Sequence, residues 1–385
     1  MKIIRWTLGI LITIVVVFEV VVFMAGKSYL NRVFALTIFS GKMGPDIDEL
    51  NLFPNHIVPN ALPQPWPVSS KYNLTQLSSA YVQEMEKYQT VSYLVIKNDS
   101  IIFEQHWEGY NNNSLVNSFS MAKSITGLLI GCAIQDGLIA GVNDPVSKYI
   151  PEFNQPELNK ITLHHLLTMS SGLDFKEDYV SPLAWPAEAY YGKDVNALTL
   201  SQATAITPPG KIWHYKGGDS QLLGIILKQV TGKSIAAYAS EKLWKPLGAE
   251  HPAYWSLDDV GMEKVSCCWY TNAKDYARLA KLLMQHGKWN GEQLVDSSYI
   301  QASQQPAQLV NQQGEPSTQY GYQWWLMQHK GLDIVYARGI RGQYIFAIPE
   351  KNMIVVRLGH KRAKKSGDEL PDDIFLYLNA ALSME

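Results

Sequence analysis

The chain is poor in cysteine, with only three in 385 residues, and it contains no C-x-x-C pair. Two of the three, Cys267 and Cys268, are adjacent in sequence. Adjacent cysteines rarely bridge each other, so neither a disulfide framework nor a zinc site is expected. The third, Cys132, lies in an apolar helical run and is expected to be a small core residue.

Several chemistry-bearing patterns are also missing. The formal net charge is only -2 and no long basic run follows the N-terminus, so no nucleic-acid partner is expected. The chain has no G-x-S-x-G elbow, which removes the usual nucleophile of an α/β-hydrolase. It has no H-E-x-x-H, and its nine histidines lack ligand spacing. We therefore expect no metal and no organic cofactor.

The N-terminus differs from the rest of the chain. Residues 6–26 are apolar apart from Glu19, and they follow the basic residues Lys2 and Arg5. About 20 apolar residues can cross a bilayer as a helix, and basic residues ahead of them favour a cytoplasmic N-terminus. We therefore expect residues 1–26 to be an uncleaved single-pass anchor in the inner membrane, with the catalytic domain facing the periplasm or outside. A cleaved signal peptide, which would give a secreted protein, remains open.

The remaining chain divides into a linker and one domain. Residues 27–73 include the proline-rich run "FPNHIVPNALPQPWPVSS", which predicts an extended linker or a wrap over the domain. Residues 74–385 are expected to form one ordered domain. Its strands are expected within 91–107, 331–340, 342–350 and 352–360. Its helices are expected at 77–88, at 161–173, at 272–287 and at 372–384, with a further helix that begins near residue 220. Strands from both ends would form one antiparallel sheet flanked by helices, with a helical subdomain beside it, in an α+β fold.

The strongest chemical signal is Ser120-Met121-Ala122-Lys123, the only S-x-x-K in the chain. Three residues apart on a helix share one face, so the hydroxyl and the amine can meet. A serine becomes nucleophilic when a neighbouring base takes its proton, and a buried lysine can be that base. The alternative is an ordinary helix start with Ser118 as its cap.

The surrounding motifs favour the catalytic interpretation. "SFSMAKSITGLLIGCAIQDGLI", "ITLHHLLTMSSGL", "PPGKIWHYKGGDSQLLGIILKQVTGK" and "GIRGQYIFAIPEKNMIVV" follow one another in the order typical of one family. The chain resembles the serine β-lactamase/penicillin-binding-protein-like superfamily over residues 75–385. It is most similar to the branch of class C β-lactamases, esterases and 6-aminohexanoate-dimer hydrolases. The resemblance implies the β-lactamase/transpeptidase-like fold and a role for Tyr215 as proton donor to the leaving group.

Two motifs depart from the family pattern. The usual Y-x-N is Tyr215-Lys216-Gly217, which puts β-lactam and peptidoglycan turnover in doubt. In the third motif, Gly339-Ile340-Arg341-Gly342, Ile340 occupies the usual cation or histidine position. Arg341 is a candidate displaced charge, and Gly342 would allow close approach of the substrate.

The resemblance also implies an oxyanion hole and a tyrosine that covers the bound substrate. The hole would use the backbone N–H groups of Ser120 and Gln343. Tyr179 lies where a tyrosine of the 6-aminohexanoate-dimer hydrolases closes over the amide.

The sequence therefore predicts a membrane-anchored serine hydrolase acting on a small-molecule ester or linear amide through an acyl-enzyme. Ser120 would be the nucleophile, Lys123 the base and Tyr215 the proton donor. Three alternatives remain open: a non-catalytic acyl-binding or sensor domain, a peptidoglycan D-amino-acid peptidase, and a β-lactamase.

Overall fold

A six-stranded antiparallel sheet forms the centre of the computed structural model, which describes residues 2–42, 44–364 and 370–384. Its strand order is β11-β12-β13-β14-β2-β3. The strands are β2 (Thr90–Lys97), β3 (Ser100–His106), β11 (Trp325–His329), β12 (Leu332–Gly339), β13 (Gln343–Ile348) and β14 (Met353–Gly359). The predicted α+β fold, with one antiparallel sheet built from both ends of the domain, is confirmed. The sequence analysis missed the edge strand β11.

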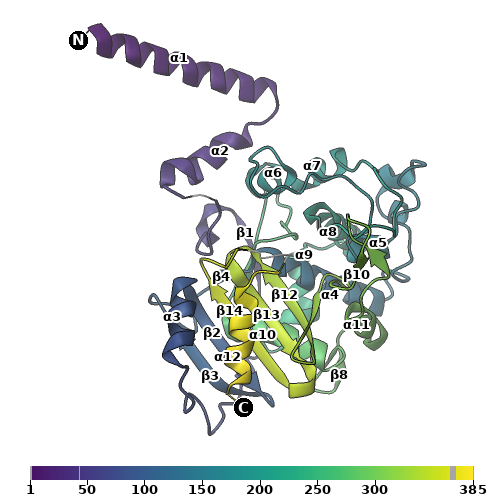
Figure 1. Cartoon of the computed structure of the whole chain (residues 1–385). Helices are drawn as coiled ribbons and strands as arrows, with labels where there is room; N and C mark the ends of the chain where they lie inside the picture. The colour runs from purple at the N-terminus through teal and green to yellow at the C-terminus, as the bar shows by residue number, and fades with distance from the viewer. Residues whose placement is uncertain (1, 43, 365–369, 385) are drawn as a thin grey trace.

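The two ends of the domain meet where β14 pairs with β2, with Val355 opposite Val95. Both strands are buried on both faces. Their sequences are therefore nearly continuous apolar runs, without the alternation of apolar and polar residues that a half-exposed strand shows. One face packs on α10 (Ala273–Met284), and the other on α3 (Ser79–Lys87) and α12 (Asp373–Leu382). In Figure 1, α12 lies over the sheet strands at the C-terminal end of the chain.

A helical subdomain lies beside the sheet (Figure 1). It contains α4 (Ala122–Gln135), α5 (Leu163–Leu167), α6 (Trp185–Tyr191), α7 (Val195–Ser201), α8 (Gly217–Thr231), α9 (Ile235–Ala239) and α11 (Ser297–Ser303). The helix expected over 161–173 is shorter, because Met169 and Gly172 both adopt positive φ. α8 starts at Gly217, three residues before the expected start.

A second, smaller sheet contains the strand that leads into Ser120. Its strand order is β1-β5-β6-β4. The strands are β1 (Asn55–Val58), β4 (Val116–Asn117), β5 (Ala253–Ser256) and β6 (Trp269–Thr271). Residues 55–58, within the segment expected to be a linker or a wrap, therefore pair with β5. Two short hairpins, β7 (Lys288–Trp289) with β8 (Glu292–Gln293) and β9 (Leu309–Val310) with β10 (Pro316–Ser317), complete the strands of the described residues.

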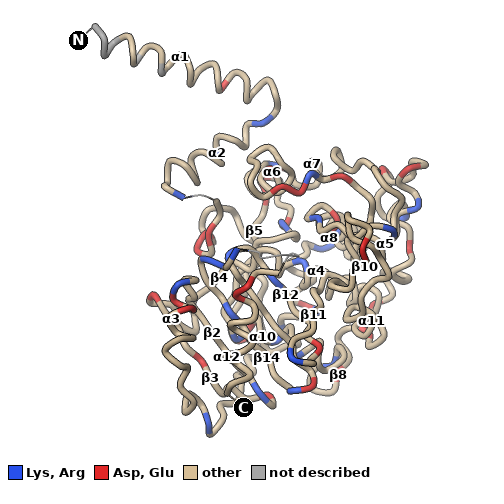
Figure 2. Tube along the Cα trace, viewed as in Figure 1, with Lys and Arg blue, Asp and Glu red and all other residues tan. Residues whose placement is uncertain are grey.

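The N-terminal segment forms α1 (Lys2–Met24) and α2 (Tyr29–Leu36). Figure 1 shows α1 extending away from the rest of the molecule, and in Figure 2 its coloured trace is tan apart from one acidic position. Within residues 2–42, 44–364 and 370–384, no helix meets the length and apolarity needed to cross a membrane. The expected transmembrane anchor is therefore not supported.

Candidate active site

Ser120 lies on a short 3-10 turn, Phe119–Met121, between strand β4 and helix α4. The preceding Phe119 has φ +44° and is almost fully buried, an unusual backbone conformation for an aromatic residue. Its N–H donates to Asn117 Oδ1 at 2.9 Å, which helps to hold the turn. This turn places Ser120 at the N-terminal end of a buried helix, where free N–H groups favour negative charge.

Lys123 is brought directly to the Ser120 hydroxyl. Its side chain is 2% exposed, and its Nζ donates to Ser120 Oγ at 3.2 Å. The same Nζ donates to the carbonyl oxygen of Ser266 at 2.6 Å, a buried contact that fixes the direction of the amine. The structure thus joins the two residues of the S-x-x-K motif and adds Ser266, which the sequence analysis missed.

Tyr215 faces the same pair from the segment that leads into α8. Lys123 Nζ lies 5.1 Å from the centroid of the Tyr215 ring. The ring packs against Trp325 at 5.2 Å and Tyr320 at 6.0 Å between centroids. Both partners come from the run "QYGYQWW", whose density of aromatic residues was the available signal for a site wall.

Tyr179 and Glu177 form a second polar pair at the nucleophile. About half of the Tyr179 side chain is exposed (52%), but its hydroxyl donates to Glu177 Oε1 at 2.6 Å and lies within hydrogen-bonding reach of the Ser120 hydroxyl. The other carboxyl oxygen, Glu177 Oε2, accepts from the Gly217 N–H at 2.8 Å. Glu177 was not singled out from the sequence.

Burial is the main cause of the raised pKa values of the Tyr179 hydroxyl and the Glu177 carboxyl. It raises the pKa of the Tyr179 hydroxyl well above its usual value near 10, and the adjacent Glu177 adds to the rise. Burial also raises the pKa of the Glu177 carboxyl, while the nearby charge of Lys123 opposes that rise. Tyr179 therefore stays protonated at neutral pH, and its single O–H proton is donated to Glu177 Oε1.

The residues after Tyr215 explain the departure from Y-x-N. A Cβ at Gly217 would lie 2.3 Å from the Trp185 ring, so the tryptophan fills the space that a side chain would need. Lys216 is buried, and its Nζ donates to Ser171 Oγ and to the Leu173 carbonyl, both at 3.1 Å. The Lys216 amine is thus used in buried contacts with Ser171 and Leu173.

In the third motif, Arg341 and Gly342 make contacts that differ from the substrate contacts expected of them. Arg341 donates from Nε to the Pro45 carbonyl at 2.5 Å and from Nη1 to the His360 carbonyl at 3.0 Å, so it ties the N-terminal segment to the domain. A Cβ on Gly342 would lie 2.1 Å from Arg357 Nη1. The side-chain space at Gly342 is therefore taken by a buried arginine rather than left open for substrate.

Gln343, the expected oxyanion partner, is not among the residues that line the two cavities next to Ser120. It is fully buried in β13, and its side-chain amide donates to the carbonyls of Ile340 and Gly359. Ile340 instead lines both cavities next to Ser120. Because the chain turns between β12 and β13 at Ile340–Gly342, the residue reaching the nucleophile comes three positions earlier than expected.

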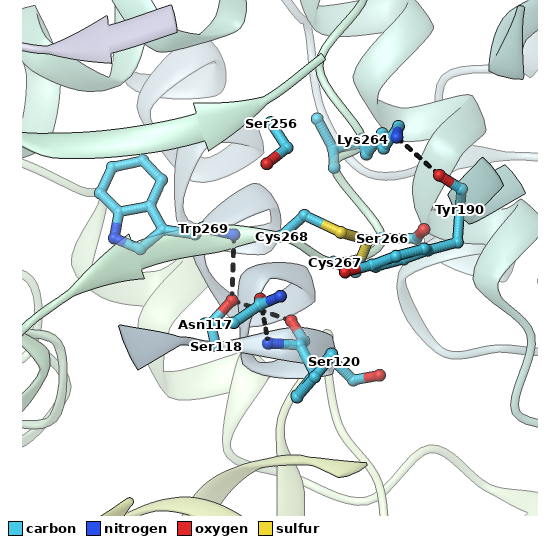
Figure 3. The surroundings of a disulfide bond; sticks show 12 residues. Asn117, Ser118, Ser120, Tyr190, Ser256, Lys264, Ser266, Cys267, Cys268 and Trp269 are labelled. Carbon is cyan, nitrogen blue, oxygen red and sulfur yellow. Dashed lines mark hydrogen bonds between the residues drawn. A yellow bond between two sulfur atoms is a disulfide. The ribbon is translucent and has the colours of Figure 1, made fainter. Parts of the chain in front are cut away.

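A disulfide directly follows Ser266, whose carbonyl accepts from Lys123. Cys267 and Cys268 are bonded to each other, so the expectation that these adjacent cysteines do not form a disulfide is wrong. They follow Ser266 in the loop between β5 and β6, and Figure 3 shows the pair together with Ser266, Ser118 and Ser120. Trp269 N–H donates to Ser118 Oγ at 3.2 Å, which connects this loop to the nucleophile turn. Cys132 is free and buried, as expected of a core residue.

Two cavities meet at Ser120. The polar cavity, of about 550 Å³, is lined by residues that include Tyr215, His214, Gln319, Arg338 and Arg362. The apolar chamber, of about 510 Å³, is lined by residues that include Val33, Phe34, Ile38, Trp185 and Ala187. Ser120, Glu177, Tyr179 and Ile340 line both. In the described part of the chain, no cluster of three or more His, Cys, Asp or Glu side chains could hold a metal ion.

Comparison with known proteins agrees with this geometry. The family model described as "Beta-lactamase" matches residues 78–379. The 6-aminohexanoate-dimer hydrolase of Paenarthrobacter ureafaciens is 24% identical over 303 residues, which cover 72% of this chain and 74% of that protein.

Solved structures show the same fold. A Bacillus anthracis protein provisionally described as a 6-aminohexanoate-dimer hydrolase superposes with a TM-score of 0.73 and 23% identity, over 86% of this chain and 90% of its own. A family VIII carboxylesterase gives a TM-score of 0.65 and 16% identity, over 83% and 99%.

Proposed function

Because the chain belongs to the beta-lactamase family, within the serine β-lactamase/penicillin-binding-protein-like superfamily, we propose that it is a serine hydrolase that cleaves ester or linear amide bonds through an acyl-enzyme on Ser120. The observation that carries the proposal is the contact of Lys123 Nζ with Ser120 Oγ at 3.2 Å, with Tyr215 against the same amine. A hydroxyl held beside an amine in this way is the arrangement that activates a serine nucleophile.

The reaction would use these groups in order. Lys123 accepts the Ser120 proton while Oγ attacks the carbonyl carbon. The oxyanion is stabilised by backbone N–H groups, for which Ser120 and Ile340 are the proposed donors in place of Ser120 and Gln343. Tyr215 gives a proton to the leaving oxygen or nitrogen as the bond to the acyl carbon breaks. The proton held by Lys123 then returns to Tyr215. Water attacks the acyl carbon and gives one proton to Lys123, the bond from that carbon to Ser120 Oγ breaks, and Lys123 passes the proton to Oγ.

Esters and linear amides are proposed ahead of β-lactams. Three features support this preference: Gly217 leaves no side chain at the asparagine position of Y-x-N, Trp185 fills that space, and Ile340 carries no charge in the third motif. We expect p-nitrophenyl butyrate to be cleaved much faster than benzylpenicillin. Benzylpenicillin turnover that matches ester turnover would contradict the preference.

A second candidate is supported by the polar cavity. Arg338 and Arg362 line it, and a buried carboxylate needs such donors to offset its desolvation. This observation supports a peptidase that releases an amino acid with a free carboxylate. Release of D-alanine from a peptide that ends in D-alanyl-D-alanine, at rates above ester turnover, would favour it.

The test of the proposed function is Ser120→Ala. We expect loss of p-nitrophenyl butyrate turnover by several orders of magnitude with an unchanged circular-dichroism spectrum. Ser124→Ala is the matched control, because Ser124 Oγ is used in a buried hydrogen bond to the Gln323 carbonyl at 2.6 Å. A non-catalytic acyl-binding domain would show no turnover in the parent protein either.

We also propose that the domain works outside the cytoplasm. A basic start followed by an apolar run is also the pattern of an export signal, which supports this location. The bonded pair Cys267–Cys268 is in keeping with an oxidising compartment, where disulfides persist. An alkaline phosphatase fused after the C-terminal helix should be active in cells, since that reporter needs export; an inactive fusion would contradict the location.

A further inference from the structure

The two cavities at Ser120 divide a substrate into two parts. Tyr215, the proposed donor to the leaving group, lines the polar cavity and is not among the residues that line the apolar chamber. The leaving group must reach Tyr215 to take its proton, so it must lie in the polar cavity. The acyl part, on the other side of the carbonyl carbon, is then directed into the apolar chamber.

The apolar chamber is suited to a hydrocarbon. Its walls are Val33 and Phe34 of α2 on one side and Trp185 and Ala187 of α6 on the other, with Phe119 next to the nucleophile. About 510 Å³ lies within the range of cavities that hold small-molecule ligands. Apolar surface removed from water in such a cavity favours binding in proportion to its area.

The charged groups at the edge of the chamber already have partners. Lys42 Nζ lies 3.3 Å from Glu49 Oε1. Arg341 donates to backbone carbonyls, as described above. Lys123 and Glu177 are at the catalytic end, where they contact Ser120 and Tyr179. The chamber therefore offers a hydrocarbon chain an apolar path away from the carbonyl.

The wall contributed by α2 is fixed to the domain. Lys27 Nζ pairs with Glu188 Oε2 at 2.5 Å, and Tyr29 donates to the Pro182 carbonyl at 3.0 Å. Arg32 Nη1 pairs with Asp259 Oδ1 at 2.9 Å. The N-terminal segment is thus part of the chamber, although it lies before the residues matched by the family model.

The rim of the chamber also exposes apolar side chains. Ile38 is 63% exposed and Val180 is 92% exposed, and both line the chamber. An aliphatic chain longer than the chamber would therefore meet apolar side chains at its rim.

We propose that the apolar chamber is the acyl subsite and that the substrates are esters or amides of medium- to long-chain aliphatic acids with a polar leaving group. The inference rests on the proposed function. In the overall reaction, water and the ester or amide give the free fatty acid and the alcohol or amine, so atoms balance without a further reactant.

The test is a chain-length series of p-nitrophenyl esters, from acetate to octanoate, each below its solubility limit. We expect kcat/KM to rise by roughly two- to fourfold per methylene until the chamber is full. A flat or falling series, with acetate still turned over and Ser120 still required, would overturn the acyl subsite and leave the hydrolase function standing. Failure to cleave any of the esters would overturn both.

Two substitutions in the walls of the apolar chamber test whether the preference for long acyl chains arises there. Ala187→Trp on α6 and Val33→Trp on α2 each fill the chamber from an opposite side, and each is partly exposed at the surface, which favours folding. We expect the ratio of octanoate to acetate kcat/KM to fall at least tenfold in both. Ala35→Trp is the matched control: Ala35 is on the exposed side of α2 and does not line the chamber, so the ratio should stay at the parent value. An unchanged ratio in both wall variants would overturn the assignment.

Discussion

At the scale of single residues, the site places two oxygen atoms around one amine. Lys123 Nζ contacts Ser120 Oγ and the Ser266 carbonyl, so one N–H direction serves the nucleophile and another is fixed by the backbone. The Tyr179 hydroxyl lies within hydrogen-bonding reach of Ser120 and donates a hydrogen bond to Glu177. The nucleophile is therefore held by groups from three separate segments, which only the folded chain brings together.

Lys264 is a buried lysine whose lowered pKa should make the stability of the protein depend on pH. Burial lowers the pKa of its amine from about 10.5 to about 7, its Nζ donates to the Tyr190 carbonyl at 2.6 Å, and it lies 3.4 Å from the centroid of the Phe53 ring. Between about pH 7 and 10.5 the unfolded chain binds more protons than the native one, so the free energy of unfolding rises with pH through this window.

We therefore expect Lys264→Met to be most stabilising, relative to the parent, at pH 7 and below. The difference in free energy of unfolding should shrink by up to roughly 4 kcal/mol between pH 7 and pH 10. Urea denaturation across that range measures it, with Lys245→Met at an exposed position as control. A difference that stays constant with pH would contradict the lowered pKa of Lys264.

The sequence was informative for residues in a local motif and less so for the others. Ser120 and Lys123 are three apart, and the structure joins them. Glu177 reaches the site because its carboxyl accepts from the N–H of Gly217, forty positions away, a contact that no local pattern indicates. Gln343 was expected at the oxyanion hole only from the family resemblance, whereas in the structure it is Ile340, in the turn at 340–342, that lines both cavities next to Ser120.

At the scale of elements, the start of α8 depends on two glycines. A Cβ on Gly217 would lie 2.3 Å from the Trp185 ring, and one on Gly218 would lie 2.4 Å from the Phe175 ring. The helix can therefore approach the aromatic side chains of the 175–185 segment only without side chains at these positions. The same close approach lets the Gly217 N–H reach Glu177.

Gly217→Asn, which restores the family pattern, should consequently impair the protein. We expect a loss of roughly 1–3 kcal/mol in stability from overpacking, and lower turnover of esters and amides alike, because Trp185 and Glu177 must move. Thermal denaturation and both assays measure it. Gly232→Asn is the control: Gly232 ends the same helix at φ +63°, where asparagine is tolerated, and nothing lies within 4 Å of its Cβ position. Unchanged stability in Gly217→Asn would contradict this packing.

The loop between β5 and β6 is the second element that controls the site. It carries the Ser266 carbonyl that fixes Lys123, directly before the bonded pair Cys267–Cys268. A disulfide between neighbours restricts the backbone of this loop. Replacing both cysteines with alanine should let the carbonyl move away from the amine.

We expect this double variant to lower kcat about fivefold, the equivalent of about one hydrogen bond, with a smaller change in KM. A dithiol reductant should lower kcat of the parent protein in the same way and leave the double variant unaffected. Cys132→Ala is the control, since this buried thiol lies in α4 away from the loop. Equal kcat values for oxidised and reduced parent protein would contradict a role for the pair.

At the scale of the whole molecule, the sequence predicted the main sheet and missed the smaller one. Strands such as 353–359 are continuous apolar runs between turns, so they are visible without tertiary information. β4 has two residues and β6 three, and both exist only because neighbouring strands pair with them. The short strand β1 was hidden in a proline-rich segment for the same reason.

The N-terminal segment has two parts with different expected effects. α1 reaches the rest of the chain near its end, where Phe18 packs on Phe34 at 5.4 Å and Glu19 accepts from Asn31 at 2.8 Å. The second part is tied to the domain by the ion pair of Lys27, just before α2, and by that of Arg32 in α2, and α2 walls the apolar chamber.

We expect deletion of residues 1–24 to leave the thermal midpoint of the domain nearly unchanged. Deletion of residues 1–40 should lower the midpoint by several degrees, because the contacts of α2 with α6 and the ion pairs of Lys27 and Arg32 with the domain are lost. Circular-dichroism melting of the two truncations compares them. Equal midpoints would show that α2 contributes nothing to the domain.

The central claim is that Ser120 carries the acyl group. The most direct measurement is mass spectrometry of protein quenched during turnover of a p-nitrophenyl ester, followed by peptide mapping. The account predicts a mass increase equal to the acyl group on the peptide that contains Ser120, absent from Ser120→Ala and removed as turnover ends. An acyl adduct on another residue, or full turnover by Ser120→Ala, would contradict it.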